Sequence, residues 1–349
     1  MKKKNSTAQQ KKVKFKNKYL KDSTIKKIYL TFKKQLFSQI KNEKFCIGVS
    51  GGPDSLALAF LCKIFSIEFN SKFITLIVDH NLRKQSGTEA LKVKKILNKH
   101  KINTKILTWR GKIPKSNIQF NARNIRYFLL NKKCKELNIK NLVLAHHESD
   151  LIENFFIRLF RGSGLKGLSS LNLKGYSEGN ILNLIRPLIN IKKDKLIYIS
   201  KKVFKFYLTD PTNFKEKFLR TRIRNYLDKF KLDGLDINKV KLTLKNLQSA
   251  NESINFYKEK SIKNYVRYFQ HDSCIVKYGL FYYESDEVIF RIISDIIPKI
   301  SENYYPPRGK DVKNLITKMQ SKGFKKSTLG GCIIEKVYNI LIFRKEFEA

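Results

Sequence analysis

The sequence predicts an α/β protein with a doubly wound, mostly parallel sheet and a mainly helical C-terminal region that ends in a small α+β element. Two observations support this fold class. Between Phe45 and Phe160, apolar runs of strand length alternate with stretches of helical periodicity, which is typical of βαβ units in a parallel sheet. After residue 190 such apolar runs become rare, and amphipathic helical patterns dominate.

Each element follows from its local pattern. Apolar residues at helical spacing predict a first helix over Ile25–Ile40. Buried parallel strands are continuous apolar runs, which places strands at Phe45–Val49, Phe73–Val78, Lys105–Trp109 and Asn141–Ala145. The intervening helices are expected at Asp54–Phe65, Thr88–Asn98, Gln119–Leu137 and Asp150–Phe160. Later helices are expected at Asp194–Phe204, Glu216–Phe230 and within 236–268, and short strands at Cys332–Glu335 and Ile340–Arg344.

Charge and composition narrow the classes of function. The chain of 349 residues carries a net charge of +43, which favours a polyanionic partner. Lysine far outnumbers arginine and Asn, Ile, Phe and Tyr are abundant, so an AT-rich coding sequence explains the lysines equally well. Five scattered cysteines without a CxxC pair argue against a disulfide framework, a zinc ribbon and a cysteine-held cluster, and favour the reducing cytoplasm. No apolar run reaches the roughly 18 residues of a membrane helix, and the basic start lacks the apolar stretch of a secretory signal.

A glycine-bearing loop follows the first predicted strand and opens a helix. Its residues are Ser50, Gly51, Gly52, Pro53, Asp54 and Ser55. The glycines allow a tight turn and close approach to an anion, and the helix start offers free N–H groups and a positive dipole end. The loop is therefore predicted to hold phosphate. It resembles the pyrophosphate loop (PP-loop) of the ATP pyrophosphatase family, which implies a Rossmann-like sheet of the PP-loop ATPase type and the use of ATP.

Four further motifs stand where a doubly wound sheet places its ligands. They are Val78–Arg83, Ala122–Tyr127, His146–Glu153 followed by Arg161–Gly164, and Asp210–Asn213 followed by Arg220, Arg222 and Arg224. Together and in this order, over about residues 43–230, they resemble the tRNA(Ile)-lysidine synthetase family. The resemblance implies ATP-dependent ligation of free L-lysine to C2 of the wobble cytidine of a CAU-anticodon tRNA(Ile), through an adenylated cytidine, with release of AMP and pyrophosphate. The product reads AUA and is charged with isoleucine.

The resemblance also implies roles for individual residues. The expected catalytic residues are Asp54, His147, Asp150 and Glu153, and Asp54 is also the candidate ligand of Mg²⁺. The expected nucleotide-binding residues are Ser50–Ser55 with Asp79 and His80. Candidates for phosphate or tRNA contacts are Arg83, Arg123, Arg126, Arg161, Arg220, Arg222 and Arg224, for which a solvated basic face is the alternative.

The chain departs from the family pattern at one informative position. Ser149 replaces the first of two consecutive carboxylates, so Asp150 carries more of the expected role. Ser149 would also be a good N-cap, which gives Asp150 and Glu153 an alternative explanation as helix-start residues. The rival functions are a PP-loop tRNA thiolase, disfavoured by the missing CxxC pair, and a non-catalytic RNA-binding PP-loop protein.

The sequence predicts three parts. Residues 1–24 are expected to be a basic mobile tail, 25–230 the PP-loop catalytic domain, and 231–349 a helical linker with a C-terminal tRNA-binding region. No membrane is expected as a partner, and the sequence leaves homodimer formation open.

Overall fold

The computed structural model describes residues 18–83, 85–112, 116–172, 174–176, 182–209, 219–269, 272–302 and 307–346. Most of the predicted basic tail, the Asp210–Asn213 motif and the first residues of the helix expected from Glu216 lie outside these residues. The chain forms two compact units, Met1–Lys241 and Leu242–Ala349.

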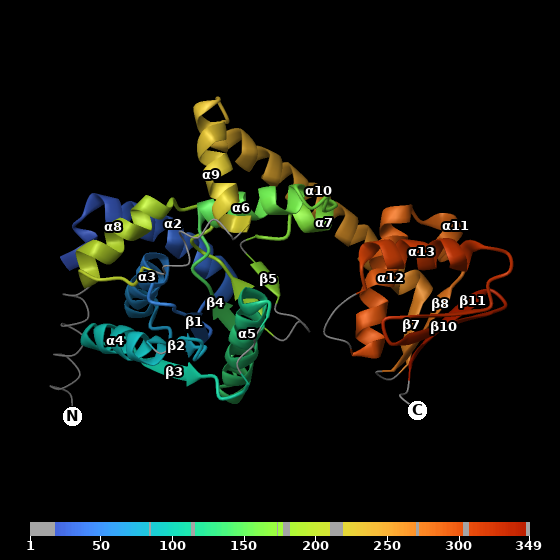
Figure 1. Ribbon diagram of the computed structural model, residues 1–349, viewed down its shortest axis with the longest axis horizontal. Helices are drawn as coiled ribbons and strands as arrows, with labels where there is room; N and C mark the ends of the chain where they lie inside the picture. The colour runs from blue at the N-terminus through green and yellow to red at the C-terminus, as the bar shows by residue number, and fades with distance from the viewer. Residues whose placement is uncertain are drawn as a thin grey trace. The chain divides into compact units, whose positions relative to one another are not determined.

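The N-terminal unit is built on a sheet with the strand order β3-β2-β1-β4-β6-β5. Five of these strands are parallel, and the edge strand β5 runs antiparallel to β6 (Figure 1). The bounds are Phe45–Gly48 for β1, Phe73–Asp79 for β2, Thr104–Thr108 for β3, Asn141–Val143 for β4, Lys174–Tyr176 for β5 and Asn183–Ile185 for β6. This arrangement confirms the predicted fold class.

Helices cover both faces of this sheet, which is why its central strands β1, β2 and β4 are mostly buried and apolar. The helices of this unit are α2 (Ser23–Ile40), α3 (Pro53–Phe69), α4 (Ser86–Lys99), α5 (Ile118–Glu136), α6 (Glu148–Leu159), α7 (Leu165–Leu168), α8 (Lys193–Phe204) and α9 (Leu219–Leu232). Alternate residues of β1 enter different cores. Phe45 and Ile47 pack with α2, α3, α4 and α8, whereas Cys46 packs with the apolar side of α5.

The topology fixes where a ligand can bind. The chain runs from β1 outward to β2 and β3, then returns to place β4 on the other side of β1. The connections that leave the carboxyl ends of β1 and β4 therefore run in opposite directions. This is the topological switch point, which is where open α/β sheets bind ligands. The Ser50–Ser55 loop leaves β1 and the His146–Glu153 segment leaves β4 at this point.

The first described residues, from Lys18 onward, already pack against the N-terminal unit. The Tyr19 ring packs edge-on against Phe60, with 5.1 Å between the centroids. Asp22 caps α2 by accepting a hydrogen bond from the Ile25 N–H, and its other carboxylate oxygen accepts one from Tyr198. These contacts join the segment before α2 to α3 and α8.

The C-terminal unit has its own core and its own sheet. Its antiparallel strand order is β7-β8-β11-β10-β9. These strands are Val266–Phe269, Ser273–Lys277, Ile340–Lys345, Cys332–Val337 and Lys326–Leu329, in that order, and the helices are α11 (Leu280–Tyr283), α12 (Asp286–Ser301) and α13 (Gly309–Gln320). Helix α10 (Ile237–Tyr265) begins in the N-terminal unit and continues into this one. Among the described residues, no helix has the length and apolar character needed to span a membrane.

Candidate active site

The loop after β1 has a backbone that only glycine allows at one position. Gly51 has a φ of +86°, and a Cβ there would lie 2.6 Å from Cγ2 of Val93 and 2.8 Å from Cδ1 of Leu208. The next residue, Gly52, is the N-cap of α3, and Pro53 begins that helix. Proline suits this first position because its missing N–H has no partner within a helix. The loop therefore presents the free N-terminus of α3 toward the switch point.

The hydroxyl of Ser55 holds the loop in shape. Its Oγ accepts hydrogen bonds from the N–H groups of Ser50 and Gly51, at 3.2 and 3.1 Å, and donates one to the carbonyl of Gly52 at 2.9 Å. The Leu208 N–H donates to the carbonyl of Gly51 from outside the loop. The loop is thus held in one shape by its own hydrogen bonds and by Leu208.

His147 connects the loop to helix α6. Its Nε2 lies 3.5 Å from a carboxylate oxygen of Asp54 and 3.5 Å from one of Asp150. Burial opposes the charged imidazole, but the two carboxylates outweigh it and raise the pKa of His147 above its ordinary value. Burial also disfavours the charged form of Asp150, yet His147, His146 and Arg220 lower the pKa of its carboxyl. Asp150 is therefore ionised near neutral pH, and the two carboxylates favour the charged form of His147.

Helix α6 begins two residues earlier than a Ser149 N-cap would place it. His147 is the N-cap and Ser149 lies inside the first turn, so the capping explanation based on Ser149 is wrong. Asp150 still serves the helix start, because its Oδ2 accepts a hydrogen bond from the His147 N–H at 3.0 Å. The same carboxylate thus orders the helix and faces the imidazole.

Glu153 is buried, with 3% exposure, and is neutralised by arginines of α9. Arg224 donates to both of its oxygens, at 2.6 and 3.2 Å, and Arg220 Nε lies 3.1 Å from Oε2. Arg220 also reaches Asp150, at 3.9 Å. The four predicted catalytic residues therefore belong to one continuous chain of charged groups, from Asp54 on the loop to Arg224 on α9.

The end of β2 lies on the other side of the loop. Asp79 is buried, and its Oδ1 accepts a hydrogen bond from the Asn81 N–H at 2.9 Å. Burial and the charge of Arg126 lower the pKa of His80 to about 4, against the opposing effect of Asp79. His80 is therefore neutral at physiological pH and suited to hydrogen bonding.

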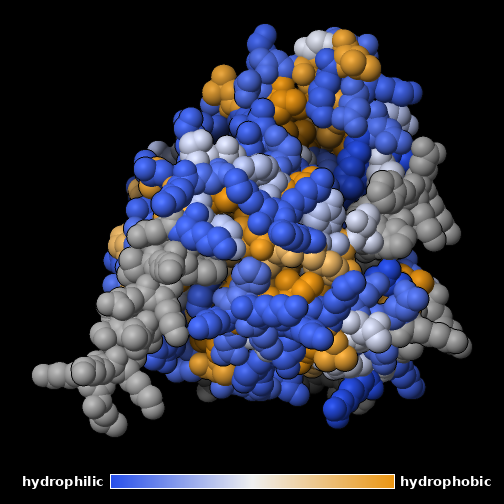
Figure 2. Space-filling model, turned by 90° about the vertical axis from the view of Figure 1, so that its left-hand side faces the viewer, coloured by the Kyte–Doolittle hydropathy of each residue, from blue (hydrophilic) through white to orange (hydrophobic). Residues whose placement is uncertain are grey.

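The other arginines predicted to bind tRNA are exposed. The Arg123 guanidinium stacks over the Tyr127 ring at 4.9 Å, and Arg83 pairs with Glu89 at 3.3 Å. Arg126, Arg161 and Arg222 are exposed on α5, after α6 and on α9. Figure 2 shows that the face carrying α2, α4 and α8 is largely hydrophilic, and its exposed lysines include Lys26, Lys27, Lys34, Lys92, Lys95, Lys99, Lys195 and Lys201.

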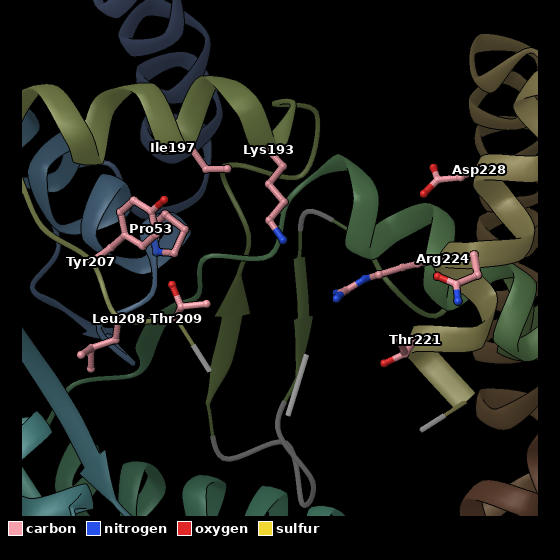
Figure 3. Close-up of a pocket in the computed structure, with 10 residues that line it drawn as sticks. Pro53, Lys193, Ile197, Tyr207, Leu208, Thr209, Thr221, Arg224 and Asp228 are labelled. Carbon is pink, nitrogen blue, oxygen red and sulfur yellow. The ribbon is translucent and has the colours of Figure 1, made fainter. Parts of the chain in front are cut away.

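A cavity of about 490 Å³ opens beside Pro53. It is lined by Pro53, Lys193, Ile197, Tyr207, Leu208, Thr209, Thr221, Arg224, Asn225 and Asp228. Lys193 and Arg224 point into it from opposite sides, from α8 and α9 (Figure 3). Its volume suits a ligand the size of a nucleotide. Lys193 also acts on His147 electrostatically, and the sequence analysis missed it because it lies in an ordinary run of lysines.

Asp54 has an oxygen available to a cation. Its Oδ1 is buried and has no hydrogen-bond partner among the described residues, whereas Oδ2 faces His147. An unpaired buried carboxylate oxygen is the kind of ligand that Mg²⁺ takes. In the described part of the chain, no group of three or more His, Cys, Asp or Glu side chains is arranged to hold a metal by itself. A cation at this position would therefore be coordinated by Asp54 together with phosphate oxygens of the substrate.

A phosphate loop at the switch point of a parallel sheet, faced by carboxylates from the next strand end, defines a PP-loop nucleotide-binding domain. A family profile described as a PP-loop domain matches residues 24–230. The chain is 34% identical over 319 residues to the tRNA(Ile)-lysidine synthase of Orientia tsutsugamushi (strain Boryong), covering 88% of this chain and 70% of that protein. It is 31% identical over 314 residues to the enzyme of that name from Wolbachia pipientis wMel, with 88% and 72% covered. The chain therefore belongs to the tRNA(Ile)-lysidine synthase family, as its motifs predicted.

A solved structure supports the fold independently. The U34-tRNA thiolase NcsA from Methanococcus maripaludis superposes with a TM-score of 0.55 at 19% identity, covering 67% of this chain and 80% of that one. At this identity the likeness establishes a shared fold.

Proposed function

We propose that the protein ligates free L-lysine to C2 of the wobble cytidine in a CAU-anticodon tRNA(Ile), consuming ATP and releasing AMP and pyrophosphate. One structural observation supports this proposal in addition to the family membership. The phosphate loop and the carboxylates of α6 are joined through His147, which contacts both Asp54 and Asp150. A site for a nucleotide and a site for a cationic amine thus share one side chain.

The first step would be adenylation of the base. The cytidine O2 attacks the α-phosphorus of ATP, and pyrophosphate leaves. The loop amides and the N-terminus of α3 suit the departing pyrophosphate, and Lys193 in the adjoining cavity adds positive charge. Mg²⁺ bound through Asp54 would neutralise phosphate charge when present. His147, in its charged form, would hold Asp54 and Asp150 in place and would not itself bind the metal ion.

The second step would be attack of the lysine ε-amine on C2, which breaks the C2–O bond and releases AMP. Asp150 is ionised and lies at the start of α6, so it is suited to attract the ammonium and orient the amine. Glu153 has a different environment, because Arg224 and Arg220 occupy its oxygens. We infer that Glu153 positions α9 against α6, and that Asp150 is the carboxylate nearest the amine.

The basic surface of the N-terminal unit would bind the tRNA. Residues 242–349 contain 18 Lys and Arg against 12 Asp and Glu, a net charge of +6, so +37 of the chain's +43 lies in the N-terminal unit. Arg222 is exposed on α9, whereas Arg220 and Arg224 of the same helix contact Glu153. We expect Arg222→Ala to weaken tRNA binding and lower the salt slope by about one charge. An unchanged affinity and slope would contradict this role.

The C-terminal unit is proposed to add a smaller contribution to tRNA binding. Lys322 and Lys325 are exposed, and Lys326 pairs with Glu335 at 3.1 Å. Alanine at these three lysines should reduce tRNA affinity most at low salt. Unchanged affinity across salt concentrations would remove the unit from the binding surface.

Two other functions are less well supported. A thiolase requires an accessible sulfur, but all five cysteines are buried. A non-catalytic RNA-binding protein would have no use for an ordered link between the phosphate loop and α6.

The deciding experiment incubates purified protein with ATP, labelled lysine and tRNA bearing a CAU anticodon, then digests the tRNA and identifies the nucleoside. Lysidine, AMP and pyrophosphate in equal amounts are expected. Asp54→Asn and Asp150→Asn should abolish lysine incorporation while tRNA retention on a filter persists. Asp233→Asn, at an exposed carboxylate of the same unit, is the matched control and should remain active. Wild-type protein that binds tRNA but neither exchanges pyrophosphate nor incorporates lysine would support the non-catalytic alternative.

A further inference from the structure

Arg186 is a buried arginine that the site described above does not use. It follows β6 directly and is 6% exposed. Leu184 packs in the core beneath α5 and Ile185 in the opposite core. Because side chains alternate along a strand, Arg186 lies on the α5 side of the sheet. It therefore stands at the carboxyl edge of the sheet, next to the end of β4.

Among the described residues, the Arg186 guanidinium is held in place without an acidic partner. Nη1 donates to the carbonyl of Asn172 at 2.9 Å, and Nε is buried with no partner among the described residues. The group lies against the backbone of β5, where a Cβ at Gly175 would come within 2.9 Å of Nη1. Burial and the charge of Arg123 lower the pKa of Arg186, opposed by Tyr127, and no carboxylate of the described part of the chain contributes.

A second buried arginine shows what a structural one looks like in this protein. Arg291 of α12 is 1% exposed and donates to Glu287 at 2.7 Å and to Asn251 and Asn255 at 2.8 and 2.9 Å. A buried guanidinium normally requires such compensation, because leaving a charge unpaired in the interior is costly. Each arginine keeps one buried nitrogen unpaired, Nη2 in Arg291 and Nε in Arg186, but only Arg291 has a carboxylate partner among the described residues. This difference indicates that the anion of Arg186 arrives with a ligand.

The neighbouring groups define what that ligand is. His146, at the end of β4, interacts electrostatically with both Asp150 and Arg186. The site therefore offers a negative and a positive group around one neutral imidazole. This polarity complements a molecule with an ammonium at one end and a carboxylate at the other. A ribose-flanked RNA phosphate fits less well, because Arg186 is buried whereas Arg123 at the surface is exposed.

We propose that Arg186 binds the α-carboxylate of the amino-acid substrate and so sets the distance from that carboxylate to the amine held by Asp150. The proposal rests on the function proposed above. It makes Arg186 a specificity-determining residue that selects an amino acid over a simple diamine.

The test compares L-lysine with L-lysinamide, in which the carboxylate is neutralised. Equilibrium dialysis of labelled ligand with wild-type protein should show lysine bound at least 10-fold more tightly, as expected for a charge-assisted hydrogen bond. Arg186→Met should bring the two affinities within about 2-fold of each other, and Arg186→Lys should restore part of the preference. Equal affinities in the wild type, no lysine binding, or a preference that survives in Arg186→Met would each overturn the proposal.

Two further measurements exclude indirect effects. Because the free protein gains no ion pair from Arg186, Arg186→Met should unfold at the same or a higher urea concentration, whereas Arg291→Met should be destabilised and keep the lysine preference. The tRNA affinity of Arg186→Met should match the wild type, and tRNA-dependent pyrophosphate exchange without lysine should persist. Weaker tRNA binding with a smaller salt slope and intact lysine selectivity would assign Arg186 to an RNA phosphate instead. Loss of exchange in wild-type protein would refute the proposed ligase activity, but the dialysis result would still decide the role of Arg186.

Discussion

Replacement of Gly51 by alanine tests whether the phosphate loop is as tightly constrained as its geometry indicates. The φ of +86° costs a residue with a Cβ about 1–2 kcal/mol. The new methyl would also lie 2.6 Å from Cγ2 of Val93, which is buried and stiff at χ1. Overpacking of this kind costs about 1–3 kcal/mol. Gly51→Ala should therefore lower the free energy of unfolding by about 2–5 kcal/mol.

Gly52→Ala is the matched control for this prediction. Gly52 has a φ of −67°, and a Cβ there would meet nothing closer than Ser50 Oγ at 3.6 Å. Its cost should stay within about 1 kcal/mol, since only the N-cap preference changes. Urea unfolding of both variants measures the difference. A Gly51→Ala/Val93→Ala double variant should recover only part of the steric cost, because Leu208 Cδ1 lies 2.8 Å from the same Cβ position. Equal stability of the two single variants would refute the account of the loop.

Three other perturbations follow from the same contacts. Arg224→Met should destabilise the protein by about 3–5 kcal/mol in urea unfolding, because it leaves Glu153 buried with only the exposed Arg220 as partner; a neutral effect would show that Arg220 suffices. Burial, with smaller effects of nearby charges, lowers the pKa of His80 to about 4 and that of His146 to about 3. Below the ordinary pKa of histidine, about 6.5, both side chains therefore take up protons when the protein unfolds. The free energy of unfolding should fall as the pH drops from about 6.5 to about 4. His80→Gln and His146→Gln should flatten this fall, and an unchanged slope of urea midpoint against pH would count against it. Ser55→Ala should cost about 1–3 kcal/mol by leaving two loop N–H groups unpaired, a deficit that should shrink when pyrophosphate is added and that Ser55→Thr should largely avoid.

The central part of the fold was predictable because its signals are local. Each strand from β1 to β4 is a continuous apolar run, and each following helix has a clear period, so the predicted and observed bounds agree closely. The loop could be predicted for the same reason, since Gly51 and Gly52 directly follow a strand. Strands β5 and β6 were missed because each has only three residues, which is too short for a periodic pattern. Strand β4 is equally short, but it lies after a clear helix in the strand–helix alternation.

The C-terminal unit was the least predictable part. Its five-stranded antiparallel sheet was anticipated only at β10 and β11, which follow Gly330 and Gly331. The other strands mix polar and apolar residues over four or five positions, and their pairing joins segments far apart in sequence. Helices α12 and α13 were not anticipated either, although α12 carries a continuous isoleucine-rich apolar face.

Contacts between distant elements explain what the sequence could not supply at the site. Arg224 and Glu153 are 71 positions apart, and the pattern of alternate arginines on α9 is equally consistent with an RNA-binding face. In the structure, the arginines of α9 differ in the free energy that their contacts contribute. Breaking a buried ion pair costs about 3–5 kcal/mol, whereas an exposed charge contact is worth about 1 kcal/mol or less. RNA phosphate could not draw Arg224 away from Glu153 without a net loss, so the α9 side chain best placed to meet RNA is Arg222, which is exposed. The helix thus separates an inward arginine that orders the site from an outward one that can follow the tRNA.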